Sequence, residues 1–151
     1  MLIQLDWQNL TPKQKTEDGK HFCFDPVRKK WLVAGSEEMV RQKFLCYLTE
    51  QLKYPSGLIK IEHPLSWNKL THRSDIVLYN RDGKPLMIVE CKAPRVAIHQ
   101  AVMDQASRYN ITLRVKYLAV TNGSQTYCCS INYETGAATF LPDFSFLKNK
   151  N

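Results

Sequence analysis

Apolar side chains at four-residue intervals mark a helix in the first third of the chain. Val40, Phe44, Leu48 and Leu52 follow this spacing, which places them in one stripe along a helix that packs on a sheet. Ser36 precedes two acidic residues, and this pattern is typical of a helix N-terminus, where a hydroxyl caps free N–H groups and acids face the positive end of the helix. We therefore expect a helix that begins at Ser36 and continues through this stripe.

Short apolar segments bounded by turn residues predict the strands of the sheet. They lie at residues 58–61, 73–79, 86–92 and 115–120, with a less regular hairpin at 127–133 and 138–141. Asp82-Gly83 stands between the second and third segments, and this dipeptide between apolar runs strongly indicates a β-hairpin. If these two residues are the centre of the turn, Asp75 lies directly opposite Glu90 on the neighbouring strand.

The remaining segments complete the prediction of one α/β domain. Ala93-Pro94 ends the strand at 86–92, and apolar residues at helical spacing then predict a second helix at about residues 96–110. Residues 1–20 are expected as a polar lead-in to a short strand at residues 22–24. The resulting order is helix, three strands, helix, strands, which predicts a mixed β-sheet flanked by helices in a single domain of 151 residues.

Asp75, Glu90 and Lys92 carry the candidate chemistry. Residues directly opposite each other across a strand pair lie about 4.5–5.5 Å apart at Cβ, so two carboxylates there repel each other unless a divalent cation binds between them. Strand alternation puts Lys92 on the same face as Glu90. A metal beside a fixed ammonium group suits phosphodiester hydrolysis, because it stabilises the charge that develops on the phosphoryl group. The alternative is that Glu90 and Lys92 form an ordinary solvated strand face.

These three residues resemble the pattern of the PD-(D/E)XK nuclease superfamily, in which an acid on one strand precedes Asp/Glu-x-Lys on the next. More narrowly, the chain resembles the N-terminal nuclease domain of type I restriction enzyme R subunits. The motifs that carry this resemblance occur in order at residues 24–31, 37–42, 73–75, 89–94, 105–110 and 121–123. The chain departs from the usual pattern at Gly35-Ser36, where family members often have a threonine-proline pair.

The resemblance implies a restriction-endonuclease-like core and a set of metal ligands. Asp75 and Glu90 would bind Mg²⁺, for which Mn²⁺ could substitute, and Cys91 would offer its backbone carbonyl. Lys92 would orient or activate the attacking water. Its charge state stays open, because burial lowers the pKa of a lysine and neighbouring carboxylates raise it.

The resemblance also points to residues on the two predicted helices. Gln105 and Tyr109 form the Gln-x-x-x-Tyr motif, which is thought to support DNA handling and cleavage. Without the resemblance, they would be a core glutamine and a packing tyrosine. Glu38 or Glu37 would be a further metal ligand, although acids at these positions are also explained as partners of the helix dipole.

Charge and cysteine content indicate the class of partner and the cellular compartment that we expect. The formal charge of +7 favours polyanionic partners, because lysines and arginines that displace counterions give affinity for nucleic acid. The five cysteines are odd in number and lack Cys-x-x-Cys spacing, so neither a disulfide framework nor a zinc ribbon is indicated. No signal peptide opens the chain, and no apolar run approaches the roughly 20 residues that span a bilayer. We expect a soluble, cytoplasmic protein with no membrane association.

The expected function is that of a metal-dependent DNA endonuclease, a Mg²⁺-dependent deoxyribonuclease of a restriction system. The chain contains no Gly-x-x-x-x-Gly-Lys-Ser/Thr loop for a triphosphate, so ATP would not drive cutting within this chain. The alternatives are a fragment of a larger subunit, a free-standing homologue and a part that acts with partners. Expected partners are DNA, motor subunits and specificity or methylation subunits. A homodimer is also considered, since cutting both strands needs two sites. The alternatives are a catalytically silent nucleic-acid-binding or assembly module on a nuclease fold, and a metal-binding enzyme unrelated to nucleic acid.

Overall fold

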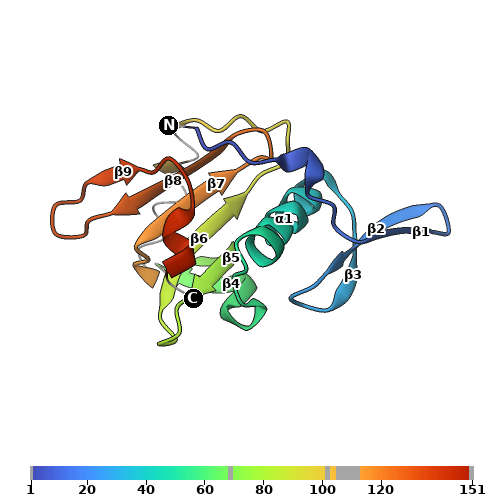
Figure 1. The fold of residues 1–151 in the computed structure, drawn as a ribbon, viewed down its shortest axis with the longest axis horizontal. Coiled ribbons are helices and arrows are strands. Elements are labelled where there is room, and N and C mark those ends of the chain that lie inside the picture. The colour runs from blue at the N-terminus through green and yellow to red at the C-terminus, as the bar shows by residue number, and fades with distance from the viewer. Residues whose placement is uncertain (1, 68–69, 101–102, 105–112, 150–151) are drawn as a thin grey trace.

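A six-stranded sheet forms the centre of the molecule. The computed structural model describes residues 2–67, 70–100, 103–104 and 113–149, and it does not describe the side chains of residues 62–74 and 149. The strands lie side by side in chain order (Figure 1). They are β4 (Ile59–Trp67), β5 (Leu70–Tyr79), β6 (Pro85–Cys91), β7 (Tyr117–Thr121), β8 (Thr126–Ile131) and β9 (Ala138–Phe140). The β6–β7 pair is parallel and the other recorded pairs are antiparallel, so the prediction of a mixed sheet is confirmed.

The hairpin between β5 and β6 reaches the predicted register by a different route. The Gly83 N–H donates to the Asn80 carbonyl and closes a turn over residues 80–83, and Gly83 itself has a φ of +79°. The loop is therefore longer than the two-residue turn expected at Asp82-Gly83. An irregularity beside Leu78 compensates, because the partner of Leu78 is Met87 while the partner of Tyr79 is Pro85. Beyond this bulge Ile76 pairs with Val89, as predicted.

Helix α1 (Ser36–Cys46) covers one face of the sheet. It continues into a π-helical turn, Tyr47–Gln51, in which the Leu52 N–H donates to the Tyr47 carbonyl, 3.0 Å away. The N-cap is Gly35 and not Ser36, and no side chain caps this end, so the predicted hydroxyl cap is wrong.

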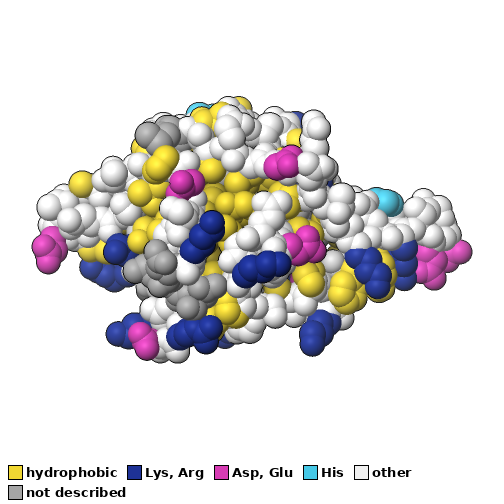
Figure 2. Space-filling model, in the orientation of Figure 1, with side chains coloured by type: hydrophobic (Ala, Val, Ile, Leu, Met, Phe, Trp, Pro, Cys, Tyr) yellow, Lys and Arg dark blue, Asp and Glu magenta, His cyan; other side chains and the backbone are white. Residues whose placement is uncertain are grey.

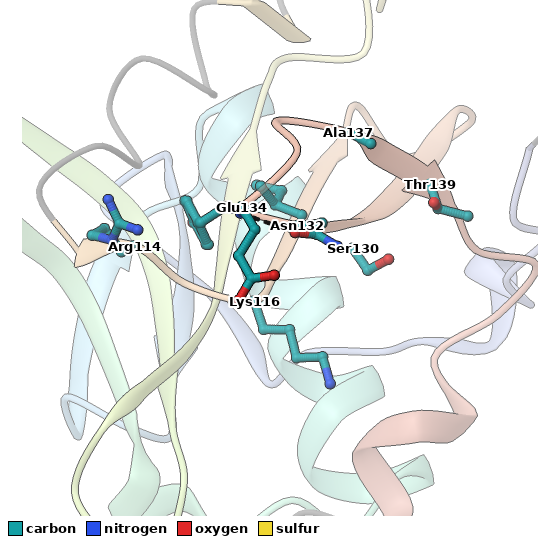
Figure 3. Close-up of a pocket in the computed structure, with 9 residues that line it drawn as sticks. Arg114, Lys116, Ser130, Asn132, Glu134, Ala137 and Thr139 are labelled. Carbon is teal, nitrogen blue, oxygen red and sulfur yellow. Dashed lines mark hydrogen bonds between the residues drawn. The ribbon is translucent and has the colours of Figure 1, made fainter.

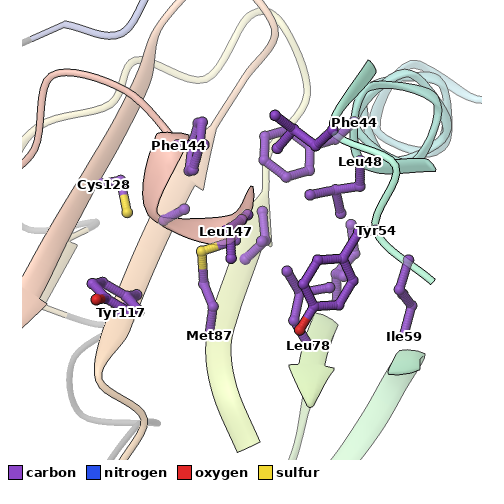
Figure 4. Packing of buried hydrophobic residues seen from close by; sticks show 14 of the residues in the cluster. Phe44, Leu48, Tyr54, Ile59, Leu78, Met87, Tyr117, Cys128, Phe144 and Leu147 are labelled. Carbon is purple, nitrogen blue, oxygen red and sulfur yellow. The ribbon is translucent and has the colours of Figure 1, made fainter. Parts of the chain in front are cut away.

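The apolar stripe of α1 is buried as predicted. Phe44 and Leu48 pack above Leu78 and Met87 of the sheet (Figure 4). The C-terminal segment adds two residues to the same core cluster: Phe144, directly before the 3₁₀ helix η4 (Ser145–Asn149), and Leu147 within it.

The opposite face of the sheet is covered by the connection between β6 and β7. Ile98, Met103 and Val115 pack there against sheet residues such as Ile88. The predicted helix at 96–110 lies largely outside the described residues; Gln100, Met103 and Asp104 have helical backbone, whereas residues 94–96 form a turn, so a start at Val96 is wrong. In the described ranges, α1 is the only α-helix that is seen from its first to its last residue. The prediction of a sheet flanked by helices is therefore corrected to a sheet with one complete helix on one face.

A second, three-stranded sheet precedes α1. It contains β1 (Gln14–Glu17), β2 (Lys20–Asp25) and β3 (Lys30–Val33), and it projects from the main body beside α1 (Figure 1). The strand expected at residues 22–24 lies within β2, but β1 and β3 were not predicted. The segment expected as a polar lead-in contains the buried side chains of Ile3 and Leu10 and the short 3₁₀ helix η1 (Trp7–Asn9). A further 3₁₀ helix, η3 (Ser56–Leu58), precedes β4. In the described part of the chain, no helix has the length and apolar character needed to cross a membrane.

Candidate functional site

Asp75 and Glu90 meet where the β5–β6 ladder ends. The last recorded pair is Ile76 with Val89, and one further step in the same register places Asp75 opposite Glu90. Beyond the ladder the Asp75 carboxylate replaces a backbone acceptor, because its Oδ2 accepts the N–H of Cys91 at 2.9 Å. The side chain is thereby fixed against the strand that carries Glu90.

Glu90 is a buried acid beside another acid. Its side chain is 4% exposed, and its Oε1 has no hydrogen-bond partner among the described residues. Burial and the Asp75 carboxylate raise the pKa of Glu90 from 4.5 to about 8, against the opposing effect of Lys92. A carboxylate with a raised pKa and an unpaired buried oxygen is a group poised to accept a proton or a cation.

Cys91 and Lys92 continue from this acid at the end of β6. Cys91 is buried, and its side chain belongs to the α1 core cluster on the other side of the sheet. Lys92 is half-buried, and its backbone N–H donates to the Thr121 carbonyl of the parallel strand β7 at 2.8 Å. This bond fixes the backbone of Lys92 close to Glu90. The positive charge of Lys92 partly offsets the rise in the pKa of Glu90.

Arg41 of α1 connects the helix to the strand acids. Its Nη2 donates to Asp75 Oδ1, and its Nη1 donates to Glu38 Oε1 at 2.7 Å. Burial opposes the charged form of Arg41, but the Asp75 carboxylate outweighs this effect and raises the pKa of the guanidinium. Glu37 approaches the same guanidinium at 3.7 Å. Arg41 therefore neutralises part of the negative charge that the acids bring together.

A buried network behind Arg41 begins at Asp25, at the end of β2. The Asp25 carboxylate is fully buried and accepts bonds from Arg28 Nε at 2.7 Å and from Gln42 Nε2 at 3.0 Å. Burial raises its pKa, but the hydrogen bonds from Arg28 and Gln42 outweigh burial and lower it. Gln42 also donates to Glu38 Oε2 at 3.1 Å. Both Glu38 oxygens are thus held by neighbouring donors.

Sequence analysis did not assign a role to Asp25, Arg41 or Gln42. One local signal was present, since Arg41 and Gln42 stand three and four residues after Glu38 and therefore share a helix face with it. The contact of Arg41 with Asp75 spans 34 residues and has no local signal.

The donor set at this site fits a divalent cation. Asp75 and Glu90 supply two adjacent carboxylates, one of them with a buried oxygen that lacks a partner, and Mg²⁺ is commonly held by one or two carboxylates with water. Among the residues that the structure describes, no three His, Cys, Asp or Glu side chains form a cluster arranged for a metal. Arg41 instead binds two of the predicted ligands, Asp75 and Glu38. Mg²⁺ binding by these residues stays a prediction.

Gln105 and Tyr109 lie outside the described residues, so their positions relative to Asp75 and Glu90 are not part of this site. Their roles also stay predictions.

A hollow of about 640 Å³ lies away from this site, at the other end of the parallel strands. Its lining includes Arg114, Lys116, Asn132 and Glu134, from the start of β7 and the β8–β9 hairpin (Figure 3). Glu90 and Lys92 come from the opposite, carboxyl end of β6, which runs parallel to β7. The hollow therefore does not belong to the acid cluster.

Comparison with known proteins places this chain in a family. Residues 36–144, nearly three quarters of the chain, match the family model described as the type I restriction enzyme R protein N terminus. No curated protein matches the chain. A solved fragment assigned to the HsdR subunit of a type I restriction enzyme from Vibrio vulnificus YJ016 is 26% identical, with a TM-score of 0.41, over 57% of this chain and 18% of that one. On the extent of the family match, this chain belongs to the family of N-terminal domains of type I restriction enzyme R proteins.

Proposed function

We propose that this domain is a metal-dependent DNA endonuclease of a restriction system. One observation carries the proposal: the buried Glu90 carboxyl has an unpaired oxygen and a pKa raised to about 8 beside Asp75, with Lys92 near enough to oppose that rise. Such an arrangement costs folding free energy unless a cation or a proton occupies it. Membership of the R protein family supports the restriction setting.

The residues at the site divide the work of phosphodiester hydrolysis. Asp75, Glu90 and the Cys91 backbone carbonyl would hold Mg²⁺, with Mn²⁺ as a substitute. When bound, the metal would supply charge stabilisation at the phosphate and acidify a water. Lys92 would donate hydrogen bonds to the phosphate oxygens or hold the attacking water. Glu90 must release its proton before it can act as an anionic ligand, so activity should rise with pH as this carboxyl ionises.

Arg41 would hold the Asp75 carboxylate in place. Its guanidinium binds both Asp75 and Glu38, so it links the strand acids to α1 before substrate arrives. Gln105 and Tyr109 are proposed to contact DNA from the connection after Lys92. Motor, specificity and methylation functions would come from partner subunits or from other parts of a longer protein, and cleavage of both strands would need a second copy of the site.

Cleavage of supercoiled plasmid, single-stranded DNA and RNA tests this proposal. The intact chain is compared with Asp75→Asn, Glu90→Gln and Lys92→Met, each in Mg²⁺, Mn²⁺ or EDTA. We expect metal-dependent nicking of DNA that falls at least about 100-fold in each variant, the loss typical when a group that stabilises transition-state charge is removed. Lys84→Gln, at an exposed position of the β5–β6 loop, is the matched control and should cut normally.

A catalytically silent nucleic-acid-binding or assembly module is the second candidate. The observation that favours it is the engagement of Asp75 and Glu38 by Arg41, which gives these acids a structural explanation. In that case the chain would bind DNA equally well with and without EDTA, would never cut it, and the three variants would bind like the unaltered chain. Binding of this kind without any nicking would refute the nuclease proposal for this chain.

A further inference from the structure

The three-stranded sheet has one face turned to the body and one turned away. On the inner face, Cys23 and Asp25 are fully buried, and Asp25 is bonded to Gln42 of α1. The strand register puts Phe22 opposite Val33 and Phe24 opposite Trp31 on the other face. We call this the lysine–aromatic face, and it comprises Lys13, Lys15, Phe22, Phe24, Trp31 and Val33.

The apolar side chains of this face are not needed by either core. Among the described residues, neither core cluster includes Phe22, Phe24, Trp31 or Val33. Val33 is 66% exposed, and the three aromatic residues are only half-buried. Three rings gathered on an uncovered sheet face are typical of an interaction surface, because single exposed apolar residues are common but clusters of them are not.

Two lysines are fixed above these rings. The Lys15 ammonium lies 4.5 Å from the Trp31 ring centroid, and the Lys13 ammonium lies 5.4 Å from that of Phe24 and 5.6 Å from that of Trp31. Cation–π attraction therefore orders both ammonium groups at the surface. Glu17 contacts Lys15 at 3.0 Å, but both side chains are exposed and such pairs are weak. Figure 2 shows Lys and Arg side chains beside hydrophobic ones on this projecting sheet.

We propose that the lysine–aromatic face binds the phosphate backbone of duplex DNA next to the position of cleavage. This extends the proposed function, on which the identity of the polyanion rests. The ammonium groups cover the rings, so a base could stack there only by displacing a cation, whereas a phosphate meets the cations directly. Lysines already ordered by the rings lose little further freedom when a phosphate binds.

The position of the face suits this role. Asp25 ends β2 and bonds to Gln42, Gln42 bonds to Glu38, and Arg41 joins Glu38 to Asp75. This chain of contacts links the projecting sheet to the acid cluster. Duplex DNA held on the face would therefore have a defined position relative to Asp75 and Glu90.

Fluorescence anisotropy with a labelled DNA duplex, in EDTA to prevent cutting, tests the proposal. The double variant Lys13→Gln/Lys15→Gln is compared with Arg81→Gln/Lys84→Gln, which removes the same charge from the exposed β5–β6 loop. We expect the first variant to bind about tenfold more weakly and to lose about 1.8 from the slope of log affinity against log salt, the value for two phosphate contacts. The loop variant should change both quantities far less. Lys13→Arg/Lys15→Arg should retain binding, and Trp31→Ala, checked for folding by circular dichroism, should weaken it.

Four results would overturn the inference. Equal losses in the two double variants would mean that only overall charge matters. An unchanged affinity for the duplex with a reduced affinity for a single-stranded oligonucleotide would assign the face to single strands. Unchanged affinity for both the duplex and the single strand would exclude nucleic acid as the partner of this face. Self-association of the chain that Trp31→Ala abolishes would identify a second copy of the chain as the partner. The binding test is made in EDTA, so its result does not depend on whether the chain cleaves DNA. If the chain cleaves DNA but its affinity for DNA does not change in Lys13→Gln/Lys15→Gln, this inference is refuted and the proposed function is not.

Discussion

Replacement of Glu90 by glutamine should remove a pH dependence from the stability of the domain. The folded pKa of Glu90 is about 8, against an ordinary value of 4.5, because burial and Asp75 disfavour the charged form. Between these values the folded domain holds a proton that the unfolded chain has released, so the free energy of unfolding falls as the pH rises. Below 4.5 the group is protonated in both states, and above about 8 it is ionised in both and the loss is complete.

The size of the effect follows from this difference in pKa. A difference of one bound proton changes the free energy of unfolding by about 1.4 kcal/mol for each pH unit. Between about pH 5.5 and 7.5, the unaltered domain should therefore lose about 3 kcal/mol more stability than Glu90→Gln. Urea unfolding in EDTA, followed by the fluorescence of the three tryptophans, measures both profiles. Asp82→Asn, at an exposed acid of the loop, should keep the unaltered slope.

Parallel pH profiles of the unaltered domain and Glu90→Gln would refute this reasoning, because Glu90 would then not be buried beside Asp75. Mg²⁺ provides a second check. The metal binds ionised carboxylates and competes with the proton, so it should stabilise the unaltered domain more at high pH than at low pH. Glu90→Gln should gain less from Mg²⁺ at every pH.

Two further substitutions probe the framework around the site. Asp25→Ala should destabilise the domain by about 1.5–3 kcal/mol in urea unfolding, because it removes the fully buried carboxylate that accepts bonds from Arg28 and Gln42, although both donors retain their contacts with Glu38. A loss below about 1 kcal/mol, the usual worth of one hydrogen bond, would show that the network is not formed. Gly123→Ala should cost about 1–3 kcal/mol, since φ is +99° and a Cβ would lie 2.9 Å from Trp7 Nε1, whereas Gly57→Ala, with open space, should be nearly neutral. Equal stability of the two glycine variants would contradict the close approach of Trp7.

Local patterns predicted the parts of the fold that local physics controls. The stripe from Val40 to Leu52 predicted the buried side of α1, and the pairing of Ile76 with Val89 was predicted from the hairpin signal. That pairing was correct although the turn was not, because the longer loop and the bulge beside Leu78 offset each other. A dipeptide signal indicates that a hairpin forms, but it does not contain the loop length or the bulge.

Two features could not be predicted because distant residues create them. β1 is short and polar, and the apolar run of β3 has only three residues, so neither carries a clear strand signal, and pairing with β2 forms them. Arg41 could not be assigned a role from the sequence, because its contact with Asp75 depends on the packing of α1 on the sheet. The acids themselves were identifiable because their spacing along two adjacent strands is local.

The bonds of Asp25 also bear on where this structural unit begins. The family match starts at residue 36, the first residue of α1, and so excludes β1, β2 and β3. Yet Asp25 supplies the acceptor for Gln42, which in turn holds Glu38 beside Arg41. A chain shortened to the matched region would leave the buried side of α1 with polar groups that have lost their partners. The boundary of the cooperative unit therefore lies N-terminal to the start of the family match.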